Sequence, residues 1–571
     1  MENKTYIIGK DASLEKSIAR MQKQLESLGF HIVEHSWLNP LPHVWSVHIR
    51  DRDCPLFFTN GKGASKKAAL ASALGEFFER LATNYFWADY YLGDEMSEHA
   101  FVHYKNEKWF SIEANEVRQN QWPEGLLSAE LLAFYDPDKT LTMLDLVDIN
   151  SAHSKRGVCA LPYICQRNQQ TVWFPVNIIG NLYVSNGMSA GNTPSEARVQ
   201  ALSEIFERHV KFKILEEGMT LPDVPPSILD QYPSIKEGIA KLEQEGFGVL
   251  IKDASLGGQY PVICVVLLNP ENQGCFASFG AHPKFEVALE RSLTELVQGR
   301  ELNSLNEFPA PIFDLDEVAS QENLETHFID SSGLVSWEFL KNDADYEFSQ
   351  CDFEGSTDEE FLWLCELIHQ SGRDIYISDY DHLGVYACRI LVPSMSEIYP
   401  SEDLLWANNN NGISIRKEIL RLAELSSEEA ATLLETIQHK DIDDLQPVAA
   451  LIGIPVQADT IWKDFRVAEL NVMLAAISGQ IEKVREGCEW ITSFGQLETT
   501  RMQGYSYILT VLQSENPDDY KRALQKMFPE KVIQQAEALM SGKLEGYNFE
   551  NSLHQGLISG YEKIHLAKER A

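Results

Sequence analysis

The chain has 571 residues and a formal net charge of −37, and 44% of its residues are hydrophobic. A chain of this length exceeds what one hydrophobic core holds, so we expect two or three domains. The acidic charge argues against direct binding to nucleic acid and favours a basic protein partner. The longest apolar runs have only strand length and the first residues do not resemble a signal sequence, so we expect no membrane segment and a cytoplasmic location.

The nine cysteines are widely spaced, and no two of them form a Cys-x-x-Cys pair. Their spacing therefore predicts neither a zinc site nor a disulfide framework. It also lacks the closely spaced triad that ligates an iron–sulfur cluster.

The first 400 residues predict a mixture of helices and strands. Strand-like apolar runs occur at residues 44–49, 56–59, 172–176, 249–252, 262–268 and 384–392. The segment 314–358 is acidic and irregular, which is typical of an insertion or a bridge. The asparagine run that ends at Gly412 predicts a domain boundary.

Beyond this boundary the sequence predicts helices almost throughout. The expected helices span residues 413–425, 427–438, 443–452, 462–479, 480–492, 499–513, 518–527, 529–540 and 551–567. Ala475, Ala476 and Gly479 would permit a close helix contact, as in tetratricopeptide-like hairpins. We therefore predict an α+β fold with a domain over residues 1–407 and an all-helical domain over 408–571, which would bind a partner or form a homodimer.

A twelve-residue pattern occurs twice, at residues 69–80 (ALASALGEFFER) and 197–208 (ARVQALSEIFER), with seven identical positions. A weaker third copy, ALERSLTELVQG, spans residues 288–299. Helical spacing places the apolar residues of each copy on one side and the acidic residues on the other. The acidic stripes carry Glu76, Glu79, Glu204, Glu207 and Glu295. If these helices face one another, the carboxylates require cations, and oxygen ligands of this kind suit Mg²⁺.

Glycine-rich segments at residues 60–65 and 186–193 precede the first two helices, with Ser65 and Thr193 as expected N-caps. We predict glycine turns there, which would offer backbone N–H groups to a phosphate. Together with a magnesium cluster, such turns indicate a nucleoside triphosphate. Two alternatives remain open: ordinary solvated helix faces with ion pairs, and a serine hydrolase in which Ser189 of Gly-x-Ser-x-Gly is the nucleophile.

These patterns resemble the three signature motifs of the YcaO family, and the resemblance covers about residues 1–400. It implies an ATP-binding fold without a Walker loop. It also implies that Mg²⁺ is held by the five glutamates of the acidic stripes. The nucleotide contacts implied by the resemblance are Lys10, Ser17, Arg20, Ser72, Ser189, Asn192, Glu196, Gln200, Arg208 and Arg291.

Members of this family use ATP to activate a peptide-bond oxygen as a phosphate. Those that form azolines typically end in a proline-rich tail, whereas this chain has no proline after Pro529. The resemblance instead implies the branch that assists the radical-SAM methylthiotransferase RimO, which β-methylthiolates an aspartate of a small-subunit ribosomal protein. An ATP-hydrolysing, amide-activating enzyme and a non-catalytic ATP-binding scaffold both fit this interpretation.

Overall fold

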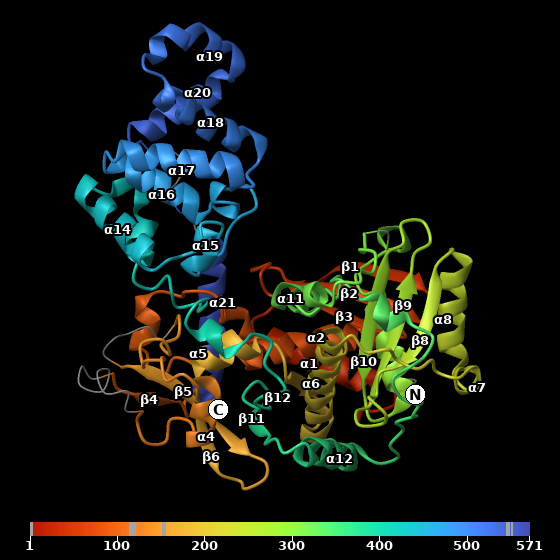
Figure 1. Ribbon diagram of the computed structural model, residues 1–571. Coiled ribbons are helices and arrows are strands. Elements are labelled where there is room, and N and C mark those ends of the chain that lie inside the picture. The colour runs from red at the N-terminus through yellow and green to blue at the C-terminus, as the bar shows by residue number, and fades with distance from the viewer. Residues whose placement is uncertain (1–3, 113–121, 151–155, 306, 544–548, 550–551) are drawn as a thin grey trace.

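A computed structural model describes residues 4–112, 122–150, 156–305, 307–543, 549 and 552–571. The chain forms a mixed lobe of helices and strands, called the first lobe, and a projecting helical lobe (Figure 1). The final helix returns from the helical lobe to the first lobe. Within the described residues, no helix combines the length and the apolar character that crossing a membrane requires.

The first lobe contains three antiparallel sheets among its described residues. Their strands are β1 Ile32–Leu41, β2 Val44–Asp51, β3 Phe58–Gly63, β4 Lys108–Phe110, β5 Val158–Cys165, β6 Thr171–Pro175, β7 Met188–Gly191, β8 Gly248–Asp253, β9 Val262–Leu268, β10 Cys275–Ala281, β11 Tyr376–Tyr380 and β12 Tyr386–Leu391. The sheet orders are β1-β2-β3, β10-β9-β8 and β4-β5-β11-β12-β7, with β6 paired to β5.

The described helices of the first lobe are α1 Leu14–Leu28, α2 Lys66–Ala82, α4 Ala129–Tyr135, α5 Val176–Ile178, α6 Pro194–Glu217, α7 Pro226–Leu229, α8 Pro233–Gln244, α9 Phe285–Leu296, α10 Leu315–Val318, α11 Gln321–Ile329 and α12 Thr357–Gln370. The predicted apolar stripes belong to α2, α6 and α9. The predicted N-caps are confirmed, since Ser65 accepts a hydrogen bond from the backbone of Ala68 and Thr193 from that of Glu196.

Three strand–helix units, β3-α2, β7-α6 and β10-α9, repeat the same local packing. The Thr59 hydroxyl donates to Ala73 O over 2.8 Å, and Ser278 donates to Ser292 O over the same distance. In both pairs the acceptor, Ala73 or Ser292, is the fifth residue of the repeated motif, and the donor precedes it by 14 positions. The sequence repeat is therefore a repeat of structure as well.

The three units are arranged in a closed ring. Helix α2 packs on its own strand β3 and also on β7, and α6 packs on β7 and also on β10. Helix α9 packs on β10 and closes the ring against β2 and β3. The acidic stripes of α2, α6 and α9 consequently face a common centre.

The prediction of glycine turns that open α2 and α6 is wrong, although residues 184–187 form a turn in which Gly187 has a φ of 76°. Residues 60–63 belong to β3, and residues 188–191 form β7. The glycines serve helix packing: a Cβ on Gly61 would lie 2.0 Å from Ala69 O, and one on Gly191 would lie 2.8 Å from Ala197 N. Glycine is therefore required because strand and helix approach so closely.

Most of the predicted strands occur, but several strands were not predicted. The apolar runs at 44–49, 172–176, 249–252, 262–268 and 384–392 correspond to β2, β6, β8, β9 and β12, and the run at 56–59 is displaced to β3. The prediction omitted β1, β4, β5, β7, β10 and β11. The acidic segment 314–358 contains only short helices until α12 begins.

The helical lobe has its own apolar core. Its helices are α13 Arg416–Leu420, α14 Ser427–His439, α15 Val448–Leu451, α16 Val467–Ile477, α17 Ile481–Phe494, α18 Thr499–Gln513, α19 Lys521–Met527 and α20 Glu530–Met540. Helix α16 packs on α17, and α17 packs on α18. The tetratricopeptide likeness stays a prediction.

The last helix, α21 (Ser552–Arg570), departs from the predicted domain division. The sequence assigns it to the domain over 408–571, yet Leu557, Tyr561 and Ile564 lie in the core of the first lobe. Trp87 Nε1 donates to Leu557 O over 2.9 Å. The end of the chain is therefore part of the lobe that contains its beginning.

We expect Leu557→Ala to lower the free energy of unfolding of the first lobe by about 2–5 kcal/mol, because a cavity replaces a fully buried side chain. The measurement is denaturant unfolding followed by tryptophan fluorescence. Leu566→Ala is the control on the same helix, since Leu566 is 49% exposed. Equal effects of the two substitutions would contradict the docking of α21.

Lys568 near the end of α21 yields a pH-dependent prediction. Its ammonium donates to Asn84 Oδ1 and His103 O, and burial lowers its pKa from 10.5 to about 7 although Glu107 opposes the shift. Between these values the unfolded chain binds more protons, so this group makes the free energy of unfolding increase with pH. In thermal melts over this range, Lys568→Met should flatten the increase and the exposed control Lys440→Met should retain it. Parallel curves for the two variants would refute the assignment.

Candidate functional site

A cavity of about 610 Å³ lies where α2, α6 and α9 converge with the N-terminal segment. The structure places all fifteen residues that the sequence predicts for the site along its wall. They are Lys10, Ser17, Arg20, Ser72, Glu76, Glu79, Ser189, Asn192, Glu196, Gln200, Glu204, Glu207, Arg208, Arg291 and Glu295. Residues from distant parts of the chain thus share one space.

The acidic stripes of α2 and α6 carry equivalent ion pairs. Arg80 Nη2 lies 2.5 Å from Glu76 Oε1, and Arg208 Nη2 lies 2.8 Å from Glu204 Oε1. Each pair joins residues one turn apart on a single helix. The alternative of solvated ion pairs is thus correct about the pairing, although the pairs line a cavity and not an open helix surface.

The other carboxylates of these stripes are more isolated. Among the described residues, Glu79 and Glu207 form no ion pair within 4 Å. Burial and the carboxylates of Glu204 and Glu76 raise the pKa of Glu79 well above its ordinary range. Burial also raises the pKa of Glu204, although Arg208 opposes the change. A divalent cation would relieve this repulsion.

Glu196, in the first turn of α6, anchors the N-terminal segment at the cavity. Its buried carboxylate accepts hydrogen bonds from Asn192 Nδ2 and from the Asp11 backbone N–H, and Lys10 Nζ lies 3.4 Å away. Ser17 Oγ donates to Asn192 Oδ1 over 2.8 Å. These contacts fix Lys10 and Ser17 beside the acidic helices.

Arg291 joins the second and third strand–helix units. Its Nη1 donates to Ala281 O over 2.9 Å, and its Nη2 contacts the Gln200 side-chain oxygen. Burial lowers the pKa of Arg291, although the carboxylates of Glu207 and Glu204 oppose the shift. The guanidinium is therefore a fixed positive charge inside the cavity.

Lys62 and His282 are among the cavity residues that were not predicted as site residues from the sequence. Lys62 pairs with Glu295, and burial lowers the pKa of Lys62 to about 8 against the effect of nearby carboxylates. His282 Nδ1 accepts a hydrogen bond from the Lys284 backbone over 3.0 Å, which leaves the proton of the neutral ring on Nε2. The feature that could have identified both residues is their position, since each lies at the end of a strand that precedes a repeated helix.

The donor set fits a nucleotide with a hard divalent cation. Over the described part of the chain, no group of three His, Cys, Asp or Glu side chains is arranged as a ready metal site, since several carboxylates point at Arg or Lys. Three buried guanidinium nitrogens of the cavity residues, Arg20 Nε, Arg80 Nε and Arg208 Nη1, have no hydrogen-bond partner among the described residues. Carboxylate oxygens for a metal and free cationic donors for phosphates are thus both present.

Ser189 lies inside strand β7, where its Cα pairs with that of Cys388 on β12. A hydrolase nucleophile instead occupies a sharp turn between a strand and a helix. The serine-hydrolase alternative is therefore wrong, because Ser189 lies within the strand Met188–Gly191, which approaches α6 closely.

Comparison with known protein families agrees with this geometry. The model of the YcaO cyclodehydratase domain, described as ATP- and Mg²⁺-binding, matches residues 60–396, and that of the YcaO cyclodehydratase C-terminal domain matches residues 412–570. The chain belongs to the YcaO family. ATP and Mg²⁺ are accordingly the cofactors of the YcaO domain.

Two curated relatives match almost end to end. The ribosomal protein S12 methylthiotransferase accessory factor YcaO of Escherichia coli is 51% identical, over 99% of this chain and 98% of its own length. An uncharacterized protein of Haemophilus influenzae is 50% identical, over 100% of this chain and 99% of its own.

Solved structures that resemble this chain share much less sequence with it. YcaO from Methanopyrus kandleri bound with AMPPCP and Mg²⁺ is 16% identical over 70% of this chain and 96% of that one, with a TM-score of 0.42. A heterocyclase in complex with substrate and cofactor is 15% identical over 70% of this chain and 54% of that one, with a TM-score of 0.43.

Replacing Glu79 by glutamine should show whether this residue binds the metal or stabilises the fold. We expect no loss of thermal stability in Mg²⁺-free buffer, because the substitution removes a crowded carboxylate that has no ion-pair partner. The stabilisation that Mg²⁺ and ATP give the wild-type protein should be lost. Thermal melts with and without Mg²⁺·ATP measure both effects.

Glu76→Gln is the matched comparison, since it leaves Arg80 without its carboxylate partner. It should lose the ligand effect and also unfold at a lower temperature without Mg²⁺. A Glu79→Gln protein that is strongly destabilised yet still stabilised by Mg²⁺·ATP would show Glu79 to be structural.

Proposed function

We propose that this chain is an ATP- and Mg²⁺-dependent accessory factor for β-methylthiolation of an aspartate of ribosomal protein S12. The observation that supports this most directly is the 51% identity, over 99% of the chain, with the Escherichia coli accessory factor. The partner would be the radical-SAM methylthiotransferase RimO. The nine cysteines of this chain include no closely spaced triad, so the partner supplies the iron–sulfur chemistry.

In this proposal the cavity binds the nucleotide through cations from several elements. Lys10, Arg20 and Arg291 would contact the phosphates or position them, since each lines the cavity from a different segment. Glu76, Glu79, Glu204, Glu207 and Glu295 would hold the metal. Mg²⁺ would supply charge neutralisation for the phosphates when bound.

The chemical role we propose is activation of a peptide amide. An amide oxygen is a poor leaving group, and transfer of the γ-phosphoryl group of ATP to it releases ADP and creates a good one. The arginines of α2 and α6 would stabilise the charge on the transferred group. The cavity would exclude water from the reacting atoms because three packed helices surround it.

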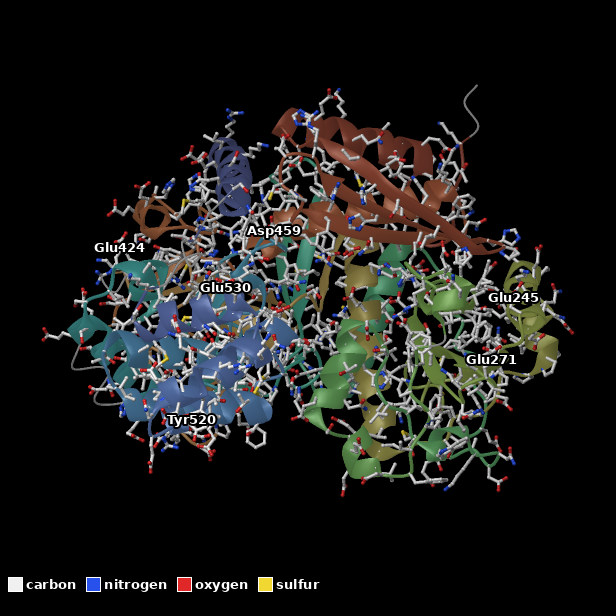
Figure 2. The ribbon with its side chains drawn as sticks, turned by 90° about the horizontal axis from the view of Figure 1, so that it is seen from above. Glu245, Glu271, Glu424, Asp459, Tyr520 and Glu530 are labelled. Atoms are coloured by element: carbon white, nitrogen blue, oxygen red, sulfur yellow. The ribbon has the colours of Figure 1, made fainter. Side chains whose placement is uncertain are left out.

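The surface charge favours a basic polypeptide partner. In the view of Figure 2, Glu424 and Glu245 lie near opposite edges of the molecule, with Glu271 close to Glu245, and Asp459 and Glu530 lie nearer the middle of the view. They belong to both lobes, so the acidic character is not confined to the cavity. A ribosomal protein would be attracted to such a surface.

The experiment for this proposal uses cells in which Glu76→Ala replaces the natural chain. We expect the methylthiolated fraction of S12, measured by mass spectrometry, to fall without disappearing, because RimO performs the sulfur chemistry. Glu435→Ala, which removes an exposed glutamate of the helical lobe, is the control and should leave the fraction unchanged. Normal methylthiolation in the Glu76→Ala strain would mean that the ATP site serves another substrate.

Release of ADP or AMP by the purified protein distinguishes an enzyme from a scaffold. Release that increases with an S12 peptide and is lost in Glu76→Ala supports amide activation. ATP binding without release, in a protein that still supports methylthiolation, would instead identify a nucleotide-dependent scaffold that presents the substrate.

A further inference from the structure

Lys62 reaches the acidic helices from a strand. It lies on β3, and the corresponding residues on the strands of the other two units are Ala190 and Ala281. Its side chain is 29% exposed and is ion-paired with Glu295 of α9. The repeated architecture therefore places a lysine in one unit where the other two have only a methyl group.

The surroundings of Lys62 include carboxylates from all three acidic helices. Besides Glu295 of α9, the charges of Glu76 on α2 and of Glu204 and Glu207 on α6 act on its ammonium. The arginines differ in this respect, because Arg80 and Arg208 each pair with a carboxylate one turn away on their own helix. Lys62 is the cation that these three helices share.

A cation in this position has the electrostatic role of a metal ion. Crowded carboxylates remain ionised only beside positive charge, and the ammonium provides it in the metal-free protein. Mg²⁺ requires its oxygen ligands at about 2.0–2.1 Å, so a Glu295 carboxylate that binds the ion turns away from Lys62. The ion and the ammonium also repel each other, so binding of one weakens binding of the other.

We propose that Lys62 is an exchangeable counter-ion that neutralises Glu295 without metal and moves to the terminal phosphate when Mg²⁺·ATP binds. Lys62 then determines the preference of the cavity for a nucleoside triphosphate. This inference rests on the proposed use of Mg²⁺·ATP by the same cavity.

Once the metal engages Glu79 and Glu207, which form no ion pair among the described residues, the terminal phosphate is the anion that remains for the displaced ammonium. Glu76, Glu204 and Glu196 already have cationic partners in Arg80, Arg208 and Lys10. A lysine side chain is a flexible point charge and binds phosphate without demanding a fixed orientation. Phosphate binding by Lys62 therefore needs no exchange among the other ion pairs.

The backbone around Lys62 is held in place while its side chain can move. Gln298 Nε2 donates to Asn60 O over 3.2 Å, and the Gly299 backbone N–H donates to Ser46 Oγ over 3.3 Å. These bonds fasten β2 and β3 to the end of α9. Exchange of partners requires only rotation of the lysine side chain, which exposed and half-buried residues achieve rapidly.

The test measures binding by calorimetry for Lys62→Met and for the control Lys67→Met, whose lysine is 55% exposed and pairs with Glu15. The titrants are MgCl₂ alone, the non-hydrolysable analogue AMPPCP with Mg²⁺, and ADP with Mg²⁺. For Lys62→Met we expect Mg²⁺ alone to bind about five- to tenfold more tightly, because a competing cation is gone. AMPPCP should bind about tenfold more weakly while ADP changes little, because a contact to the terminal phosphate is lost.

Lys62→Arg shows whether a change in the methionine variant comes from the lost charge or from a folding defect. It keeps the positive charge, so its affinity for Mg²⁺ alone should stay within about twofold of wild type, as should that of Lys67→Met. Unchanged or weaker Mg²⁺ binding by Lys62→Met overturns the counter-ion role. Equal losses for AMPPCP and ADP overturn the contact with the terminal phosphate. Wild-type protein that binds no AMPPCP would instead overturn the proposed function, and this inference with it.

Discussion

Repulsion among carboxylates at the centre of the first lobe is the constraint on which the rest of the site depends. Three helices direct glutamates into one cavity, and burial raises the pKa of Glu79 and of Glu204 there. Such a cluster is stable only with positive charge beside it. The arginines and Lys62 supply part of that charge from the protein, and the cofactor Mg²⁺ supplies charge from outside.

A repeated strand–helix unit produces this crowding. In β3-α2, β7-α6 and β10-α9, a glycine of the strand (Gly61, Gly191 and Gly280) lets the helix approach the strand backbone closely. Each helix also packs on the next sheet, so the three units close into a ring whose centre is the cavity. An ATP site of this kind needs no glycine-rich phosphate loop, because the cations come from side chains of converging elements.

The C-terminal helix, which follows the helical lobe in sequence, is hydrogen-bonded to the first lobe. Lys568 of α21 donates a hydrogen bond to Asn84, just beyond the end of α2, and Tyr104 OH donates to Ala82 O. Helix α2 carries Glu76, Glu79 and Arg80 at the cavity. The C-terminal helix is therefore bonded to the segment that directly follows a helix of the site.

The amino-acid sequence determined the local part of this structure. Apolar residues at helical spacing predict the buried sides of α2, α6 and α9, and Leu74, Phe77, Leu202 and Ile205 are at most 1% exposed. The same spacing places the glutamates on the opposite side, so their meeting in one cavity could be predicted although Glu76 and Glu295 are 219 positions apart. Helix faces are predictable because their periodicity is encoded within a few turns.

Only the tertiary structure decided the strand pairing, the role of the glycines, the position of Lys62 and the docking of α21. The segments 60–63 and 188–191 lack the apolar alternation of a strand, and they become strands because a helix covers them and neighbouring strands pair with them. Helix α21 follows the helical lobe in sequence, yet the apolar surface that accepts it belongs to residues near the other end of the chain. Contacts between distant segments leave no local pattern, since they depend on which surfaces meet after folding.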